Sequence, residues 1–160
     1  MSPKSEFINV KMQKDFNEEC ITEHNRLRAL HGCPKLTLDE NLARGAQEHA
    51  KYLAQIQRLE HTSGDYGENL VFVGGTSGVK LSGAEATKKW YKEIKDYRYE
   101  NDVQLECGHF TQVIWKETTC AGFGRASNKD GTKVYAVGRY YPPGNFEGQC
   151  IENVPKPLNA

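Results

Sequence analysis

The sequence predicts an α+β fold, a three-layer α-β-α sandwich in which helices cover a small antiparallel sheet. Three observations lead to this prediction. Apolar residues recur at helical spacing in three segments, near residues 15–31, 37–57 and 82–97. Two runs rich in strand-forming residues, 120–127 and 133–141, flank a turn that contains Asp-Gly. A Gly- and Ser-rich stretch, 63–81, surrounds one further short apolar run.

The first two helices are predicted from stripe and boundary signals together. The first runs from about Asp15 to His31, where a Gly and then a Pro end it. His24 and Leu27 lie on its apolar stripe, so we expect His24 to be a hydrogen-bonded core histidine. The second helix is predicted to begin at Thr37, since a Glu three residues later gives the spacing of a capping box.

The third helix is predicted to start near Ser82, because Glu85 follows it at capping-box spacing. Its apolar stripe continues to Tyr97. A short helix is expected over His109 to Trp115, and after it the pattern changes to strands. The two strands of the hairpin meet at residues 128–131, where the turn requires positive φ.

A chain of 160 residues is the usual size for one domain with one core. We place that domain at residues 14–150. Residues 1–13 are predicted to be a flexible N-terminal tail and residues 151–160 a C-terminal tail. No internal repeat or low-complexity block divides the chain.

The composition excludes some classes of protein. Lys plus Arg equals Asp plus Glu at 21 each, and this balance argues against a nucleic-acid partner, which usually requires a basic excess. No apolar run approaches the roughly 20 residues that span a bilayer. The first 20 residues are polar and lack the apolar core of a signal peptide. We therefore expect a cytoplasmic protein; an extracellular one whose leader is missing is the alternative.

The five cysteines are odd in number and include no Cys-x-x-Cys pair. A disulfide framework usually needs an even count, and reducing compartments disfavour disulfides. We therefore expect mostly free thiols, with one or two disulfides as the alternative. The cysteines are Cys20, Cys33, Cys107, Cys120 and Cys150.

Four segments, in this order along the chain, resemble the motifs of the CAP superfamily, which comprises cysteine-rich secretory, antigen 5 and pathogenesis-related proteins. They are HNRLR at 24–28, GENL at 67–70, GHFTQVIWKET at 108–118 and RYYPPGNF at 139–146. The eleven-residue run fits the family's first signature at every position. The resemblance covers roughly Asp15 to Cys150 and implies the same three-layer fold.

Departures from the family pattern indicate which branch of the family this chain resembles. Secreted members usually carry half-cystines where Phe123 and Gly138 stand here, and Cys107 lacks its usual companions. This loss resembles the Golgi-associated pathogenesis-related branch, which implies a location on the cytosolic side of the Golgi membrane. Myristoylation requires Gly after the initiator Met, and this chain has Ser2. Membrane binding is therefore expected to depend on the protein surface alone.

The resemblance also implies a central cleft with two histidines and two glutamates. Mapped by motif, these are His61, Glu68, Glu93 and His109. The sequence supports Glu93 independently, because it shares the apolar stripe of the third helix and a carboxylate there needs a partner.

This set of four residues leaves three interpretations open: a hydrogen-bonded structural network, a weak metal site, or a catalytic centre. Two imidazoles with one or two carboxylates suit Zn²⁺ or another divalent cation, although no cofactor is required. No nucleophile–base–orienter set and no hydrolase motif occurs in the sequence. We therefore predict a protein without enzymatic activity, with a metal-assisted hydrolase as the alternative.

A basic stripe is predicted on the third helix. Lys88, Lys92 and Lys95 fall at i, i+4 and i+7, with Lys89 beside them. Such a stripe is either an ordinary solvated face or a contact with acidic phospholipid headgroups. Together with the resemblance, it predicts a binding module that associates peripherally with acidic phospholipid membranes and can form a homodimer. A secreted defence or venom-allergen-type protein is the alternative.

Overall fold

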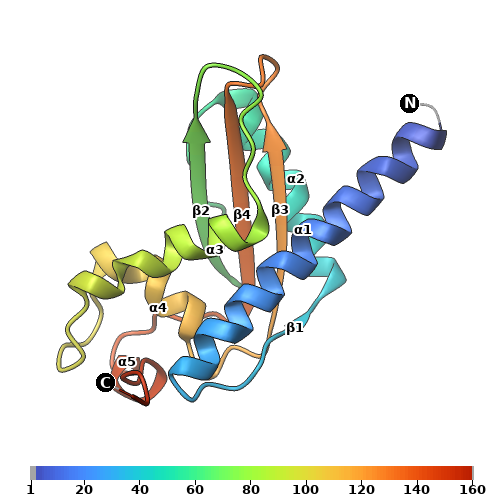
Figure 1. The fold of residues 1–160 in the computed structure, drawn as a ribbon. Coiled ribbons are helices and arrows are strands. Elements are labelled where there is room, and N and C mark those ends of the chain that lie inside the picture. The colour runs from blue at the N-terminus through green and yellow to red at the C-terminus, as the bar shows by residue number, and fades with distance from the viewer. Residues whose placement is uncertain (1–2, 160) are drawn as a thin grey trace.

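The computed structural model describes the backbone of residues 3–159 and the side chains of residues 9–159. A four-stranded sheet with the order β1-β3-β4-β2 lies at its centre (Figure 1). The two longer pairings, of β2 with β4 and of β3 with β4, are antiparallel, whereas the short β1 runs parallel to β3. The sheet is therefore mixed, not antiparallel throughout. The strands are β1 (Thr37–Leu38), β2 (Gly67–Gly74), β3 (Cys120–Ser127) and β4 (Lys133–Tyr141).

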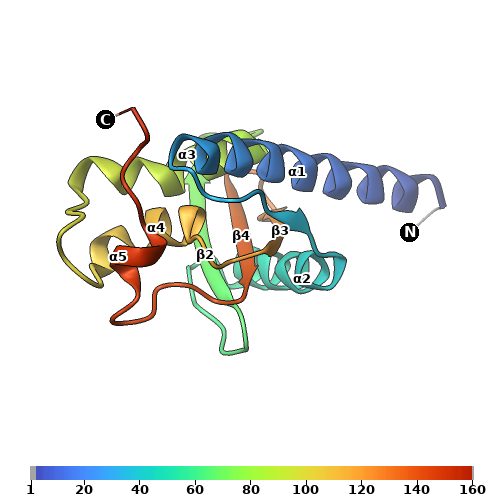
Figure 2. The ribbon, with the colours of Figure 1, turned by 90° about the horizontal axis from the view of Figure 1, so that it is seen from below.

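Helices cover both faces of the sheet, which confirms the predicted three layers. The helices α1 (Pro3–Leu30) and α3 (Gly83–Tyr91) lie on one face and α2 (Glu40–Ile56) lies on the other (Figure 2). Shorter elements gather near one end of the sheet. These are α4 (Gly108–Ile114), α5 (Cys150–Asn153) and the 3₁₀ helices η1 (Lys92–Asp96) and η2 (Leu105–Cys107).

Local sequence signals predicted several elements correctly. Ser82 is the N-cap of α3, and both hydrogen bonds of its capping box with Glu85 are present. The short helix α4 follows where it was expected. The β3–β4 hairpin turns at Gly131, whose φ of +69° favours glycine. All five cysteines are unpaired, as expected for a chain of free thiols.

The start of α2 differs from the prediction. Its N-cap is Asp39, whose Oδ1 accepts a hydrogen bond from the Leu42 N–H at 2.8 Å. Thr37 lies instead in β1, where its N–H donates to the Thr119 carbonyl at 3.1 Å. Pairing with a distant strand holds Thr37 extended, and Asp39 is an equally good capping residue. The capping-box spacing at Thr37 is therefore coincidental.

Neither predicted tail is loose over the residues that the structure describes. Residues 3–13 continue α1, because no helix-breaking residue follows Pro3 and proline is tolerated in a first helical turn. At the other end, Val154 is buried and the Leu158 N–H donates to the Leu30 carbonyl at 2.8 Å. Residues 1–2 and 160 lie outside the described part of the chain.

A buried arginine ties α1 to the segments around α4. Arg28 is 0% exposed, and its guanidinium donates to the carbonyls of Pro34, Val113, Trp115 and Thr118 at 2.7–3.1 Å. Burial lowers the pKa of Arg28 to about 10. The dipoles of these carbonyls replace the water that the cation loses, and the four bonds hold α1 to α4 and to the segments next to it.

Candidate functional site

Glu68 forms the first His–Glu pair, together with His61. Its Oε1 accepts hydrogen bonds from His61 Nδ1 and from the Thr62 N–H, each at 2.9 Å. Its Oε2 accepts from Thr62 Oγ1 at 2.6 Å and from Arg139 Nε at 3.2 Å. Arg139 stands directly opposite Glu68 in the β2–β4 register. The Glu68 side chain is only 5% exposed, whereas that of His61 is 62% exposed.

These contacts shift the pKa values of both partners. Burial alone would raise the pKa of Glu68, but hydrogen bonds from His61 and Thr62 outweigh it and lower that pKa to about 2. The hydrogen bond to Glu68 raises the pKa of His61, against the smaller opposing effect of burial. In this pair Glu68 is therefore held as a carboxylate, and the imidazole of His61 binds a proton more tightly than an ordinary histidine does.

Glu93 and His109 form the second pair. Glu93 Oε2 lies 2.8 Å from His109 Nδ1, and Oε1 accepts from the Phe110 N–H at 2.9 Å. Glu93 belongs to η1, because α3 ends at Tyr91 instead of continuing along the predicted stripe. His109 is the partner of the Glu93 carboxylate, which is 22% exposed and does not lie on a buried stripe of the third helix as expected.

A buried polar network links the two pairs to the core. Asn69, the neighbour of Glu68 on β2, donates through Nδ2 to the His109 carbonyl at 3.1 Å and to Tyr140 Oη at 3.3 Å. Tyr140 Oη also lies 2.8 Å from His24 Nε2. Burial lowers the pKa of His24 to about 3, so this histidine is neutral, as expected for a core residue.

The four side chains form two separate His–Glu pairs and not a four-ligand cage. In both pairs Nδ1 faces a carboxylate, so a neutral ring carries its proton there and presents the Nε2 lone pair of His61 or His109. Within residues 9–159, no group of three or more His, Cys, Asp or Glu side chains is arranged to hold a metal ion. The contacts therefore show Glu68 and Glu93 orienting the two imidazole rings through Nδ1.

Arg139 and Thr62 also belong to the site, although the motifs did not point to them. The Arg139 guanidinium lies over the Tyr66 ring, 4.3 Å from its centroid, and Nη2 donates to Thr62 Oγ1 at 3.1 Å. Gly45 on α2 leaves room for this side chain, since a Cβ there would lie 2.6 Å from Arg139 Nη1. Arg139 stood inside a recognised motif, but its role depends on the strand register.

No nucleophile is activated beside these groups in the described residues. Burial raises the pKa of the Cys107 thiol, and its Sγ points to the Glu93 carbonyl at 3.6 Å. The Thr62 hydroxyl donates to the Glu68 carboxylate instead of to an imidazole. The arrangement therefore contains no relay in which a histidine takes the proton of a nucleophile.

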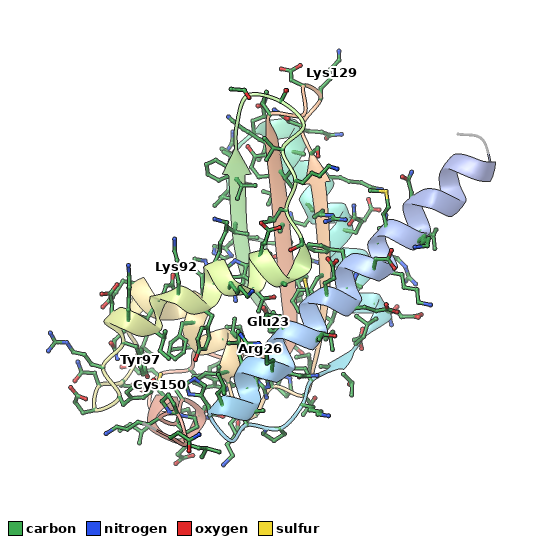
Figure 3. The ribbon with its side chains drawn as sticks, viewed as in Figure 1. Glu23, Arg26, Lys92, Tyr97, Lys129 and Cys150 are labelled. Atoms are coloured by element: carbon green, nitrogen blue, oxygen red, sulfur yellow. The ribbon has the colours of Figure 1, made fainter. Side chains whose placement is uncertain are left out.

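The four lysines of the predicted stripe are all exposed. Lys88 and Lys89 lie in the last turn of α3, whereas Lys92 and Lys95 belong to η1, and Figure 3 shows Lys92 projecting from the ribbon. Within residues 9–159, none of them forms an ion pair. Glu85 lies near enough that Lys89 and Lys88 help to lower its pKa, after the hydrogen bonds from Ser82. No helix among residues 3–159 has the length and apolarity needed to cross a bilayer.

Comparisons with known proteins extend the resemblance. The model of the cysteine-rich secretory protein (CAP) family matches residues 21–140. The chain is 38% identical to human Golgi-associated plant pathogenesis-related protein 1 over 151 residues, which cover 90% of this chain and 95% of that protein. It is 34% identical to pathogenesis-related protein 1 of Arabidopsis thaliana over 137 residues, 85% of this chain and 82% of the relative.

Solved structures share the fold at lower identity. The structure of BmVAL-1 superposes with a TM-score of 0.72 at 22% identity, covering 82% of this chain and 79% of that one. The crystal structure of NaASP2 with Zn²⁺ gives a TM-score of 0.67 at 21% identity, covering 88% and 90% of the two chains. At these identities the likeness establishes the fold alone.

Proposed function

The chain belongs to the CAP superfamily, and we propose that it is a non-enzymatic member that binds acidic phospholipid membranes peripherally, on the cytosolic side of the Golgi. The observation that carries the proposal is the row of four exposed lysines without ion-pair partners on α3 and η1. The likeness to a human protein named as Golgi-associated supports the location.

The expected attachment is modest and reversible. Each Lys near an acidic membrane contributes about 1 kcal/mol, and salt screens this attraction. Glu85 and Glu23 lie close enough to Lys88 to have their pKa values lowered in part by its charge, so some of the attraction is offset. A large unbound pool is therefore expected at physiological salt.

Flotation with phosphatidylserine- or phosphatidylinositol-containing vesicles tests this proposal. We expect binding at low salt, loss at high salt, and loss when Lys88, Lys89, Lys92 and Lys95 are all changed to Glu. The matched control changes four exposed lysines elsewhere to Glu, with the same total charge: Lys35, Lys51, Lys129 and Lys156. Binding that survives the first variant, equal loss in both variants, or no binding at low salt would refute the role of the stripe.

We further infer a weak Zn²⁺ site at the Nε2 atoms of His61 and His109. Both imidazoles are oriented through Nδ1 by a glutamate, and a structural relative is described as a complex with Zn²⁺. Calorimetry on the wild type and His109→Ala tests the site, with Cys120→Ser as the control for the most exposed thiol. We expect only His109→Ala to lose binding; equal affinity in all three proteins would exclude the site.

Broad esterase and peptidase screens should show no turnover that depends on Glu68. The reason is that Glu68 already accepts four hydrogen bonds and contacts no nucleophile other than the Thr62 hydroxyl that it binds. Activity that disappears in a folded Glu68→Gln variant would favour the alternative, a hydrolase.

A further inference from the structure

The two edges of the sheet are protected very differently. Along the edge of β3 beyond β1, two carboxamide side chains take the place of a neighbouring strand. Asn17 bonds the N–H and C=O of Phe123 at 2.7 and 2.8 Å, and Gln47 bonds those of Arg125 at 3.0 and 2.9 Å. These amides form hydrogen bonds with backbone groups that would otherwise be free to pair with a strand of another chain.

The outer edge of β2 has almost no such protection. The ladder with β4 and the bond from the Gly75 N–H to the Thr132 carbonyl place the backbone groups of odd-numbered residues toward β4. Those of Leu70, Phe72 and Gly74 therefore face outward. Trp90 Nε1 donates to the Leu70 carbonyl at 3.0 Å, but no described residue bonds the outward groups of Phe72 or Gly74.

The side chains of this edge favour pairing. Residues 69–79 contain no charged residue and no proline, the usual protections of an edge strand. Val71 and Val73 pack on the core, whereas Phe72 is 47% exposed, with its ring stacked 5.6 Å from that of Tyr135.

We propose that the β2 edge pairs antiparallel with β2 of a second copy of this chain, around a two-fold axis at Phe72. The outward groups alternate evenly about this residue, so a two-fold places Phe72 opposite its own copy and Leu70 opposite Gly74 of the partner subunit. Each Phe72 N–H then donates to the partner's Phe72 carbonyl, and each Leu70 N–H donates to the partner's Gly74 carbonyl. The two four-stranded sheets become one continuous sheet.

A second copy fits this edge better than an unrelated strand does. Opposed Cα atoms in such a hydrogen-bonded pair lie about 5.5 Å apart, which brings the two Phe72 rings together on one face. With no charge between residues 69 and 79, nothing repels the copy, and the whole chain has a net charge of zero. Because the paired segment is short, we expect a weak dimer whose affinity changes little with salt.

This pairing extends the homodimer expected from the sequence and is independent of both the lysine stripe and the Zn²⁺ site. Sedimentation velocity without lipid or metal, and with reductant present, tests it separately from them. The wild type should show a concentration-dependent monomer–dimer equilibrium at low and high salt. Phe72→Lys and Phe72→Glu should each raise the dimer Kd by at least about tenfold, since like charges then face each other.

Mixing the Phe72→Lys variant with the Phe72→Glu variant provides the test of register. A two-fold at Phe72 brings opposite charges together, so the mixture should form a heterodimer that neither variant forms with itself. Leu105→Lys is the control, because Leu105 is 88% exposed on η2, and it should leave the Kd unchanged. Circular dichroism confirms that each variant is folded.

Three results would overturn the proposal. They are a wild type that stays monomeric at all accessible concentrations, a dimer that Phe72→Lys does not weaken, and a mixture that fails to associate although each variant is monomeric. The last result would exclude the two-fold register even if the strand edge were in contact.

Discussion

The two His–Glu pairs have similar internal geometry but different surroundings. In each, a carboxylate oxygen lies 2.8–2.9 Å from the Nδ1 atom of a histidine. Glu68 is 5% exposed and also accepts from Thr62 and Arg139, whereas Glu93 is 22% exposed and accepts one further hydrogen bond, from a backbone N–H. The two pairs thus have similar His–Glu distances, but Glu68 is more deeply buried than Glu93 and accepts more hydrogen bonds.

The difference predicts that the first pair contributes more to the stability of the fold than the second pair does. Glu68 joins the segment at residues 61–62 to β4 through Arg139, and each of its oxygens already has two donors. Glu93 orients His109 and the first turn of α4, and its side chain is more exposed to solvent. We therefore assign fold stability chiefly to the first pair, while the second pair can be altered at smaller cost.

The largest expected effect is the loss of stability in Glu68→Ala. It leaves the guanidinium of Arg139, whose side chain is 12% exposed, without its carboxylate, so we expect a loss of about 2–4 kcal/mol in the free energy of unfolding. Glu93→Ala, the matched control, should cost about 1 kcal/mol because water can reach the groups it leaves. Urea denaturation measures both. Equal losses would remove the distinction between the pairs.

Acid should remove the stabilisation that the ionised Glu68 provides, with an effect of similar size. The pKa of Glu68 is lowered to about 2 in the fold from its ordinary value of 4.5. A lowered pKa stabilises the fold above the unfolded-state value, and this contribution is lost as the pH falls from about 4.5 to about 2. The difference between these two pKa values corresponds to a contribution on the order of 3 kcal/mol.

Glu68→Gln provides the comparison for this acid effect. Its stability should fall less steeply than that of the wild type across the same window, because the amide has no proton to gain. Urea denaturation at a series of pH values measures the two slopes. Parallel pH dependences would show that Glu68 titrates near its ordinary range and that its donors do not hold it ionised.

The sequence could predict what is local. The Ser82 capping box was predicted correctly because its hydrogen bonds join residues three apart. The same spacing misled at Thr37, where β1 pairs with a strand far along the chain that begins at Cys120. The first turns of α1 were also missed, since the helix extends to Pro3 and the apolar stripe in the sequence begins only near Phe16.

The candidate site was predictable in identity but not in arrangement. Motifs pointed to His61, Glu68, Glu93 and His109, and the structure pairs each histidine with one glutamate. The hydrogen bond from Arg139 to Glu68 depends on the β2–β4 register. This register places Arg139 opposite Glu68, although the two residues are 71 positions apart in the sequence. A one-residue slip would turn the Arg139 side chain to the other face, so no spacing along the chain could reveal this contact.

The smallest expected effect concerns the shape of the cation that holds Glu68. In Arg139→Lys the charge beside Glu68 remains, but the bond to Thr62 Oγ1 and the stacking on Tyr66 are lost. An ammonium is a point charge and cannot replace a planar fork, so we expect a loss of about 1 kcal/mol. Tyr66→Leu removes the stacking and also the 2.7 Å hydrogen bond between Tyr66 Oη and Thr62 Oγ1. Tyr66→Phe removes only that hydrogen bond, so the difference between the two variants gives the stacking, which should contribute about 0.5 kcal/mol. In a double-mutant cycle, Arg139→Lys and Tyr66→Leu should cost less together than the sum of their separate costs, because the Arg139→Lys variant has no stacking left to lose. Strict additivity would show that the stacking contributes nothing and that charge alone fixes Glu68.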